Sequence, residues 1–362
     1  MDAAVASTAS RGSKDLRILH IGTGLGYGGV QVLMATLIRE QQKMGLDAEA
    51  FFFTDRGGFD YFRSLCPIHI GSESSLDDVI SKGRFDIIHT VTYVAEELSA
   101  SIRRTGFRGA VVVTTHQFGE YERSLAADCV TAVSAAVAAS IQDRYASEVR
   151  VVRNGVDTSR FHPMESGLAG KPIIGWVGRC ADPIKDFDGF LAFANAMSGS
   201  FAFEVVDGSA TDFEVAGWLP PETAVRRKLP WDEMPKVYRR LRASQGFLLS
   251  TSRSEAAGLN LIEAQACGCP VIAPAIDGIP EYVARGASGF LYDRDDGLEG
   301  IRAAVDLLYA PGRYEEVSRA AAEYAARKHP AEKMCAEYLG IYEEALQRRG
   351  KHATLAPRGS RH

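Results

Sequence analysis

Two glutamates in the second half of the chain are spaced so that they could act on one ligand. Glu255 and Glu263 are eight residues apart, with Gly258 between them at the predicted start of a helix. That spacing places both carboxylates along one flank of the helix, with the unpaired N–H groups of its first turn between them. Those N–H groups can bind a phosphate, whereas carboxylates repel phosphate and accept hydrogen bonds from neutral hydroxyls. The pair suggests a nucleotide sugar, although two glutamates on a helix are more often solvated surface charges.

A second pair of charged residues has the chemistry to hold a diphosphate. Arg179 closes the segment 176–179 at the end of a predicted strand, and Lys185 follows six residues later, before a helix predicted to begin near Phe187. Arginine offers a fixed fork of donors and lysine a mobile charge, a combination that suits a diphosphate at the carboxyl end of a strand. The alternative is a solvated helix start with Asp186 as its cap.

His116 and a glycine-rich segment stand out in the first half. His116 follows the apolar run 111–115 and could bond a substrate hydroxyl across a cleft, although a single histidine is more often structural. Gly24 opens a G-x-G-x-x-G pattern within residues 22–29, directly after the first predicted strand, which could mark a dinucleotide site. So many glycines satisfy several spacings by chance, and the alternative is a flexible loop that lets a ligand approach closely.

Strand-length apolar runs alternate with helical segments along the whole chain and must position these residues. The runs occupy residues 16–21, 48–53, 86–89, 110–114, 128–133 and 149–152, then 172–177, 201–206, 246–250, 270–273 and 289–291. This rhythm predicts an α/β protein with two doubly wound parallel sheets covered by helices. The turn-rich segment 154–170 is the predicted linker, and the chain after Leu298 is predicted to end in packed helices.

Composition and charge narrow the class of protein. The 362 residues are 46% hydrophobic and 24% charged, which predicts two soluble globular domains. The six cysteines contain no C-x-x-C pair, so we expect reduced thiols. The N-terminus lacks the features of a signal peptide, and no run of eighteen apolar residues occurs, so we expect a cytoplasmic protein.

The expected partners follow from the charge pattern. A formal net charge of −5 without a long basic stripe argues against nucleic acid. The basic clusters 226–228 and 239–240 could support a weak membrane association, but exposed helix faces are the favoured interpretation. The D-x-D segments 186–188 and 293–295 are interpreted as a cap and a turn, and we expect no metal requirement.

Taken in order, these segments resemble the family 4 retaining glycosyltransferases, which have the GT-B fold. Residues 255–272 resemble the family's E-x7-E signature and its continuation, residues 175–185 its diphosphate-binding segment, and residues 154–161 the stretch that crosses into the second domain. The resemblance runs from Leu16 to about Gly350. The chain departs from the family pattern at residues 256–257, where bulkier residues are frequent. The interval from Arg179 to Lys185 is also one residue longer than the family's commonest spacing, and Asp186 stands where glycine is frequent.

The resemblance implies transfer of a sugar from a nucleotide diphosphate to an acceptor hydroxyl, with retention and without a metal. The donor is a substrate, no separate cofactor is implied, and the acceptor is a small molecule, a glycan or a lipid. Carried onto the matching positions, the resemblance implies that Glu263 holds the ribose hydroxyls and that Arg179 and Lys185 bind the diphosphate. It implies that Glu255, with the backbone of Gly258 and Leu259, binds the donor sugar and its phosphate. His116 would approach the donor sugar near the reacting carbon, and Gly28 and Gly29 would border the diphosphate and the acceptor.

The resemblance also implies a domain plan. It comprises an acceptor-side Rossmann-like domain at 14–158, a nucleotide-sugar-binding Rossmann-like domain at 159–330 facing it across a cleft, and a helix at 331–350 returning toward the first domain. The residues of the tail at 351–362 themselves predict disorder. Two other functions stay open. One is a nicotinamide-dependent oxidoreductase that uses the segment from Gly24 to Gly29, with Asp55 available for the ribose; the other is an inactive nucleotide-sugar-binding subunit.

Overall fold

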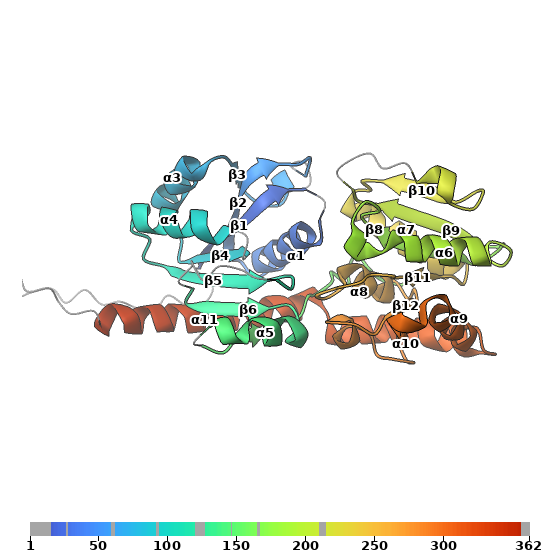
Figure 1. Ribbon diagram of the computed structural model, residues 1–362. Coiled ribbons are helices and arrows are strands. Elements are labelled where there is room, and N and C mark those ends of the chain that lie inside the picture. The colour runs from blue at the N-terminus through green and yellow to red at the C-terminus, as the bar shows by residue number, and fades with distance from the viewer. Residues whose placement is uncertain are drawn as a thin grey trace, which may run out of the picture.

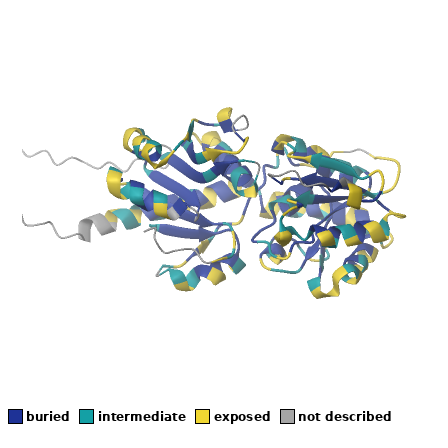
Figure 2. Ribbon diagram, turned by 45° about the horizontal axis from the view of Figure 1, so that its top comes forward, coloured by how far each residue is buried: buried dark blue, intermediate teal, exposed yellow. Residues whose placement is uncertain are grey.

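The chain folds into two α/β domains that lie side by side, each built around one parallel sheet (Figure 1). The computed structural model describes residues 16–26, 28–58, 62–91, 94–119, 127–145, 147–164, 167–209 and 215–355. The central strands are buried on both faces, whereas exposed residues gather on the outer helices and loops (Figure 2). The predicted pair of doubly wound sheets is confirmed.

The N-terminal sheet has the strand order β3-β2-β1-β4-β5-β6-β7. Its strands are β1 (Arg17–Leu25), β2 (Asp47–Asp55), β3 (Ile68–Ile70), β4 (Ile87–Val91), β5 (Ala110–Thr115), β6 (Cys129–Ala132) and β7 (Arg150–Val151). Its helices are α1 (Gly29–Lys43), α3 (Glu73–Gly83), α4 (Ala95–Thr105) and α5 (Ala135–Ile141). The order reverses between β1 and β4, so a crevice opens at the carboxyl ends of these two strands.

The C-terminal sheet has the order β10-β9-β8-β11-β12-β13. Its strands are β8 (Ile173–Gly178), β9 (Ala202–Asp207), β10 (Ala224–Arg227), β11 (Phe247–Leu249), β12 (Val271–Pro274) and β13 (Gly289–Tyr292). Its helices are α6 (Phe187–Met197), α7 (Met234–Ala243), α8 (Leu259–Ala266), α9 (Gly297–Leu308) and α10 (Arg313–Lys328). The order reverses between β8 and β11, and the predicted diphosphate and glutamate segments follow these two strands.

The last helix, α11 (Ala331–Leu355), runs back along the N-terminal domain (Figure 1). Tyr342 accepts a hydrogen bond from Gln41 of α1 at 3.1 Å and is hydrogen-bonded to His89 of β4 at 2.8 Å. Where the chain leaves and re-enters this domain, the N–H of Val156 donates to the carbonyl of His329 at 2.8 Å. The helix includes residues 351–355 of the expected disordered tail, and residues 356–362 lie outside the described residues.

The structure corrects the prediction for the cluster 226–228. Arg226 and Arg227 lie on β10, a strand at the edge of the sheet, and not on a helix face. Arg226 donates to Glu204 of the neighbouring strand β9 at 2.5 Å, so its guanidinium group pairs with a carboxylate of the same sheet. The short edge strands β3 and β10 were not predicted, because neither has a continuous apolar run. Arg239 and Arg240 do lie on a helix, α7.

The structure also corrects the position of the glycine-rich segment. Gly22 and Gly24 do not belong to a loop, because β1 continues to Leu25 and pairs with β2 up to that point. A Cβ atom on Gly22 would lie 2.8 Å from the ring of Phe52, so this glycine permits close packing between neighbouring strands. The pattern that resembled a dinucleotide fingerprint therefore begins inside a strand.

Two further expectations concern the whole chain. All six cysteines are free and buried, as predicted for reduced thiols. Over the residues that the structure describes, none of the helices combines the length and the apolar character needed to cross a membrane.

Candidate active site

A cavity of about 470 Å³ lies between the two domains and is lined by both. It brings together every residue that the sequence analysis singled out for the site. These residues are Gly28, Gly29, His116, Arg179, Lys185, Glu255, Gly258, Leu259 and Glu263. The first three belong to the N-terminal domain and the others to the C-terminal domain, so the two halves of the chain contribute to one site.

Helix α8 begins at the position that the sequence predicted. Gly258 precedes it with a φ of 75° and a ψ of 65°, in the left-handed region that favours glycine. The first turn carries no acidic residue and no side chain caps it, so the N–H groups of Leu259 and Asn260 are available to a ligand, whereas the N–H of Leu261 donates to the carbonyl of Gly258 at 3.0 Å. Asn260 donates to the carbonyl of Val177 at 3.0 Å and thereby fixes this helix start beside the end of β8.

Glu255 forms an ion pair with Lys185 in the cavity. The two side chains are only 18% and 21% exposed, respectively, so the pair is partly shielded from water. The segment that carries Glu255 is itself fixed, because the Glu255 N–H donates to the carboxylate of Asp277 at 3.0 Å. The carboxylate and the ammonium group are therefore held at one point of the cavity wall.

Arg179 lies just beyond β8 and pairs with Asp182. Its side chain is 53% exposed, so the guanidinium group reaches solvent at the cavity. Asp182 also accepts from the N–H of Ile184 at 3.0 Å and so shapes the 3-10 turn Pro183–Lys185. The turn carries Lys185 toward Glu255, which explains how the two cations reach one cavity.

Asp186 does not act as the side-chain cap proposed as the alternative. It occupies the residue before α6 with a φ of 50°, but its side chain makes no capping hydrogen bond. Instead, its carboxylate accepts from Arg253 at 2.8 Å and from Arg294 at 2.9 Å. Burial acts to raise the pKa of Asp186, but hydrogen bonds from these two guanidinium groups outweigh it and hold the pKa below the usual range.

The same segment is tied by its backbone to the segment after β11. The N–H of Arg253 donates to the carbonyl of Ile184 at 2.7 Å, and the hydroxyl of Thr251 donates to the carbonyl of Asp186 at 2.8 Å. Since Lys185 belongs to the first segment and Glu255 to the second, these bonds set the relative position of the pair.

Glu263 lies inside α8 and is buried, with 5% of its surface exposed. One carboxylate oxygen accepts from the indole N–H of Trp231 at 2.8 Å, and the other accepts from the hydroxyl of Tyr238 at 2.9 Å. Burial is the largest influence and raises the pKa of Glu263 to about 7, while these two donors act to lower it. Each oxygen retains capacity for a second hydrogen bond from a ligand.

Trp231 and Tyr238 were missed by the sequence analysis. They stand 32 and 25 residues before Glu263, in a segment that shows no motif of its own. Their one signal is that both side chains combine an apolar body with a donor that needs a partner when buried.

The N-terminal wall of the cavity is formed by His116, directly after β5, and by the start of α1. Burial lowers the pKa of His116 to about 4, so its imidazole is neutral at pH 7. Gly29 begins α1, and a Cβ atom at this position would have no neighbouring atom within 4 Å, so the backbone faces open space.

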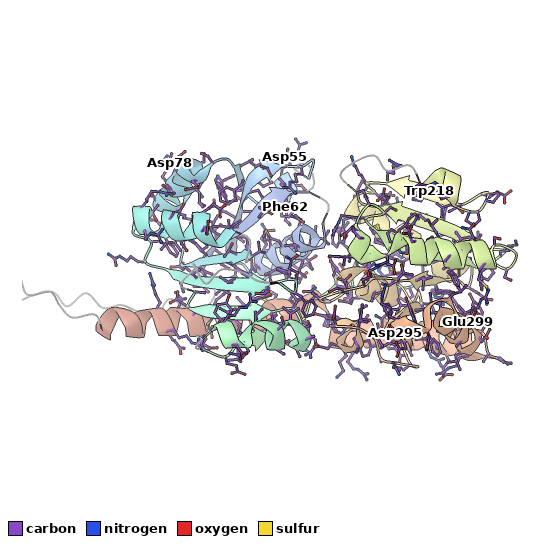
Figure 3. The ribbon with its side chains drawn as sticks, in the orientation of Figure 1. Asp55, Phe62, Asp78, Trp218, Asp295 and Glu299 are labelled. Atoms are coloured by element: carbon purple, nitrogen blue, oxygen red, sulfur yellow. The ribbon has the colours of Figure 1, made fainter. Side chains whose placement is uncertain are left out.

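Other predicted features lie elsewhere. Asp55 is exposed at the upper edge of the N-terminal domain (Figure 3), and its carboxylate accepts from the N–H of Gly57 at 2.8 Å within a turn. Asp293 accepts from the N–H of Asp295 at 3.0 Å, in the turn that leads into α9, as predicted. Within the described ranges, no group of three or more His, Cys, Asp or Glu side chains is arranged to hold a metal ion.

Two family models match the chain, one in each domain. The model described as Glycosyltransferase Family 4 matches residues 27–160, and the model described as Glycosyl transferases group 1 matches residues 221–329. Together with the two facing parallel-sheet domains, these matches define the class as glycosyltransferases of the GT-B fold. The chain belongs to the family 4 glycosyltransferases, which confirms the resemblance seen in its motifs.

Curated relatives and solved structures agree with this class. The D-inositol 3-phosphate glycosyltransferase of Acidothermus cellulolyticus is 31% identical over 271 residues, which cover 65% of this chain and 57% of that protein. The enzyme of the same name from Mycolicibacterium smegmatis is 31% identical over 255 residues, which cover 64% of this chain and 55% of that protein. The chain thus spans little more than half the length of these relatives.

Two solved structures show the same fold over nearly the whole chain. Sucrose-phosphate synthase from Thermosynechococcus elongatus has a TM-score of 0.74 at 18% identity, with 91% of this chain and 98% of that chain covered. Anabaena Alr3699/HepE in complex with UDP-glucose has a TM-score of 0.75 at 16% identity, with 90% and 100% covered.

Proposed function

We propose that this protein is a retaining glycosyltransferase that moves a sugar from a nucleoside diphosphate sugar to an acceptor hydroxyl without a metal ion. The observation that carries the proposal is the convergence, in one cavity, of two cations, an uncapped helix start and a buried carboxylate acceptor. These are the groups that a diphosphate and a ribose require.

The donor would lie mainly against the C-terminal domain. Arg179 and Lys185 would bind the diphosphate, and the N–H groups at Gly258 and Leu259 would bind the phosphate next to the sugar. Glu255 would place the sugar while it holds Lys185 in position. Its carboxylate is paired with a cation beside a phosphate site, so it is suited to recognition and not to nucleophilic attack on the anomeric carbon.

Catalysis would consist of stabilising the leaving group. As the bond between the anomeric carbon and the phosphate oxygen breaks, negative charge grows on the diphosphate, and fixed positive groups lower the barrier most there. The acceptor hydroxyl would attack from the same face, form the new C–O bond and pass its proton to the departing phosphate oxygen. His116, neutral at pH 7, would bond a hydroxyl of the donor sugar near the reacting carbon.

The names of the relatives suggest where to begin the search for substrates. The Anabaena protein binds UDP-glucose, which supports a nucleotide sugar as donor. The curated relatives are named for an inositol phosphate acceptor, which makes polyols a reasonable first acceptor class alongside glycans and lipids. A nicotinamide-dependent oxidoreductase is disfavoured, because the glycine pattern begins within β1 and Asp55, the last residue of β2, does not line the cavity.

The test is sugar transfer from a panel of radiolabelled UDP, GDP, ADP and TDP sugars to polyol, glycan and lipid acceptors, with EDTA present. Arg179→Ala, Lys185→Ala and Glu255→Ala should each lower turnover, on the order of a hundredfold for the cations. Arg302→Ala is the matched control, because Arg302 pairs with Glu299 on α9, outside the cavity lining. Unchanged turnover in all three site variants would exclude this site.

Two outcomes distinguish the other functions. Donor binding without sugar release under every acceptor condition would indicate an inactive nucleotide-sugar-binding subunit. Absorbance of the purified protein at the nicotinamide band would indicate the oxidoreductase.

A further inference from the structure

Glu263 is held by two side chains that have not been assigned a function. Trp231 is the first residue of the 3-10 turn Trp231–Glu233, and Tyr238 lies on α7, which follows that turn directly. Each donates one hydrogen bond to a different oxygen of the same carboxylate, at 2.8 Å and 2.9 Å. Two bonds to two oxygens fix both the position and the rotation of the carboxylate plane.

The two donors are themselves fixed by their surroundings. Tyr238 is fully buried, with 0% of its surface exposed. The ring of Trp231 packs against Phe161 at 5.4 Å between centroids, and the guanidinium carbon of Arg160 lies 4.4 Å from the Trp231 ring centroid. Arg39 of the N-terminal domain lies 5.5 Å from the same ring. Trp231 therefore has little freedom to turn its N–H away from Glu263.

Core packing alone does not account for this arrangement. A buried carboxylate is costly to desolvate, and an apolar residue of similar size would fill the same space without that cost. Glu263 and Trp231 also line the cavity. A carboxylate that is held rigidly, faces a cavity and has acceptor capacity left on both oxygens is suited to two adjacent hydroxyls, such as those of a ribose.

We propose that Trp231 and Tyr238 are positioning residues that hold Glu263 as the acceptor for the ribose hydroxyls, and that they thereby set the preference for ribonucleotide over 2′-deoxyribonucleotide donors. This inference rests on the proposed function, since it assumes that a nucleotide binds at Glu263. It adds that ribose selection depends on two side chains that need not touch the nucleotide.

The experiment compares binding of UDP, GDP and ADP with binding of their 2′-deoxy counterparts by isothermal titration calorimetry. At pH 8, where Glu263 is ionised because its pKa is about 7, wild-type protein should bind a ribonucleotide about tenfold or more tightly than its deoxy form, the usual effect of one hydrogen bond to a charged acceptor. Trp231→Phe and Tyr238→Phe each remove one donor and keep an aromatic ring. In each variant the ribose preference should shrink toward about twofold, while deoxynucleotide affinity changes little.

Tyr342→Phe is the matched control, because it removes the hydroxyl of a buried tyrosine on α11, where that helix packs against the N-terminal domain, away from Glu263. Its ribose preference should equal that of the wild type. If wild type binds the nucleotides and a folded Trp231→Phe or Tyr238→Phe protein keeps the full ribose preference, this inference is overturned and the proposed function stays intact. Failure of wild type to bind any of the nucleotides would contradict both. The two variants are independent, so either one suffices if the other fails to fold.

Discussion

Replacing Glu263 by glutamine should stabilise the folded protein above neutral pH. Burial raises the pKa of Glu263 from 4.5 to about 7. A carboxyl whose pKa is higher in the folded state binds more protons when folded, so the free energy of unfolding falls as the pH rises from about 4.5 to about 7. At about 1.4 kcal/mol for each pH unit, the ionised carboxylate costs about 3 kcal/mol at pH 8.

The glutamine side chain can keep both hydrogen bonds. Its amide oxygen can accept from Trp231, and its amide N–H can donate to the hydroxyl of Tyr238, because a hydroxyl also accepts. The hydroxyl of Tyr238 and the thiol of Cys267 are titratable groups that interact with Glu263, and both stay neutral at pH 8, because burial raises the pKa of Tyr238 well above its usual value and that of Cys267 to about 12. We therefore expect Glu263→Gln to gain about 1–3 kcal/mol at pH 8 and almost nothing at pH 5, while its affinity for the donor falls.

Urea denaturation of both proteins at pH 5 and pH 8 measures this difference. Glu299→Gln is the matched control, because it makes the same substitution at a side chain that is 76% exposed on α9. The reasoning is refuted if wild type and Glu263→Gln lose the same free energy of unfolding between the two pH values.

Three other changes have defined outcomes. Asp186→Asn should lower the free energy of unfolding by about 1 kcal/mol and raise the donor KM, because it weakens the ion pairs with Arg253 and Arg294 that hold the Lys185 segment. Urea denaturation and donor titration measure the two effects, and an unchanged KM would contradict the prediction. Gly258→Ala should cost about 1–2 kcal/mol and reduce nucleotide binding. Gly312→Ala is the control, because Gly312 also precedes a helix in the left-handed region but has open space around it, and thermal denaturation of this variant should show the backbone strain alone. His116→Gln should lower turnover without altering its pH dependence above about pH 5, since the pKa of His116 is already about 4; a step near pH 6.5 lost in the variant would refute this.

The sequence was most informative where short-range rules decide the structure. The start of α8 at Gly258 followed from the glycine and the apolar run beyond it, and the structure places that glycine in the left-handed region. Because the carboxyl ends of parallel strands meet at one edge, the segments after β8 and β11 could be expected to share a site. Both of them line the cavity.

The rest depended on contacts between residues distant in the chain. The pairing of Asp186 with Arg294 joins residues 108 positions apart, so nothing local distinguishes that aspartate from an ordinary helix cap. The strand β10 was hidden because arginines occupy it, and one of them, Arg226, pairs with Glu204 on the neighbouring strand. Likewise, the extension of β1 through Gly24 depends on its partner β2.

The most direct test of the central claim is a crystal structure of the protein soaked with a nucleotide sugar that its transfer assay accepts. The account predicts a diphosphate within hydrogen-bonding distance of Arg179, Lys185 and the N–H of Leu259, with the ribose hydroxyls on Glu263. A nucleotide bound elsewhere, or one in this cavity whose ribose lies away from Glu263, would contradict it.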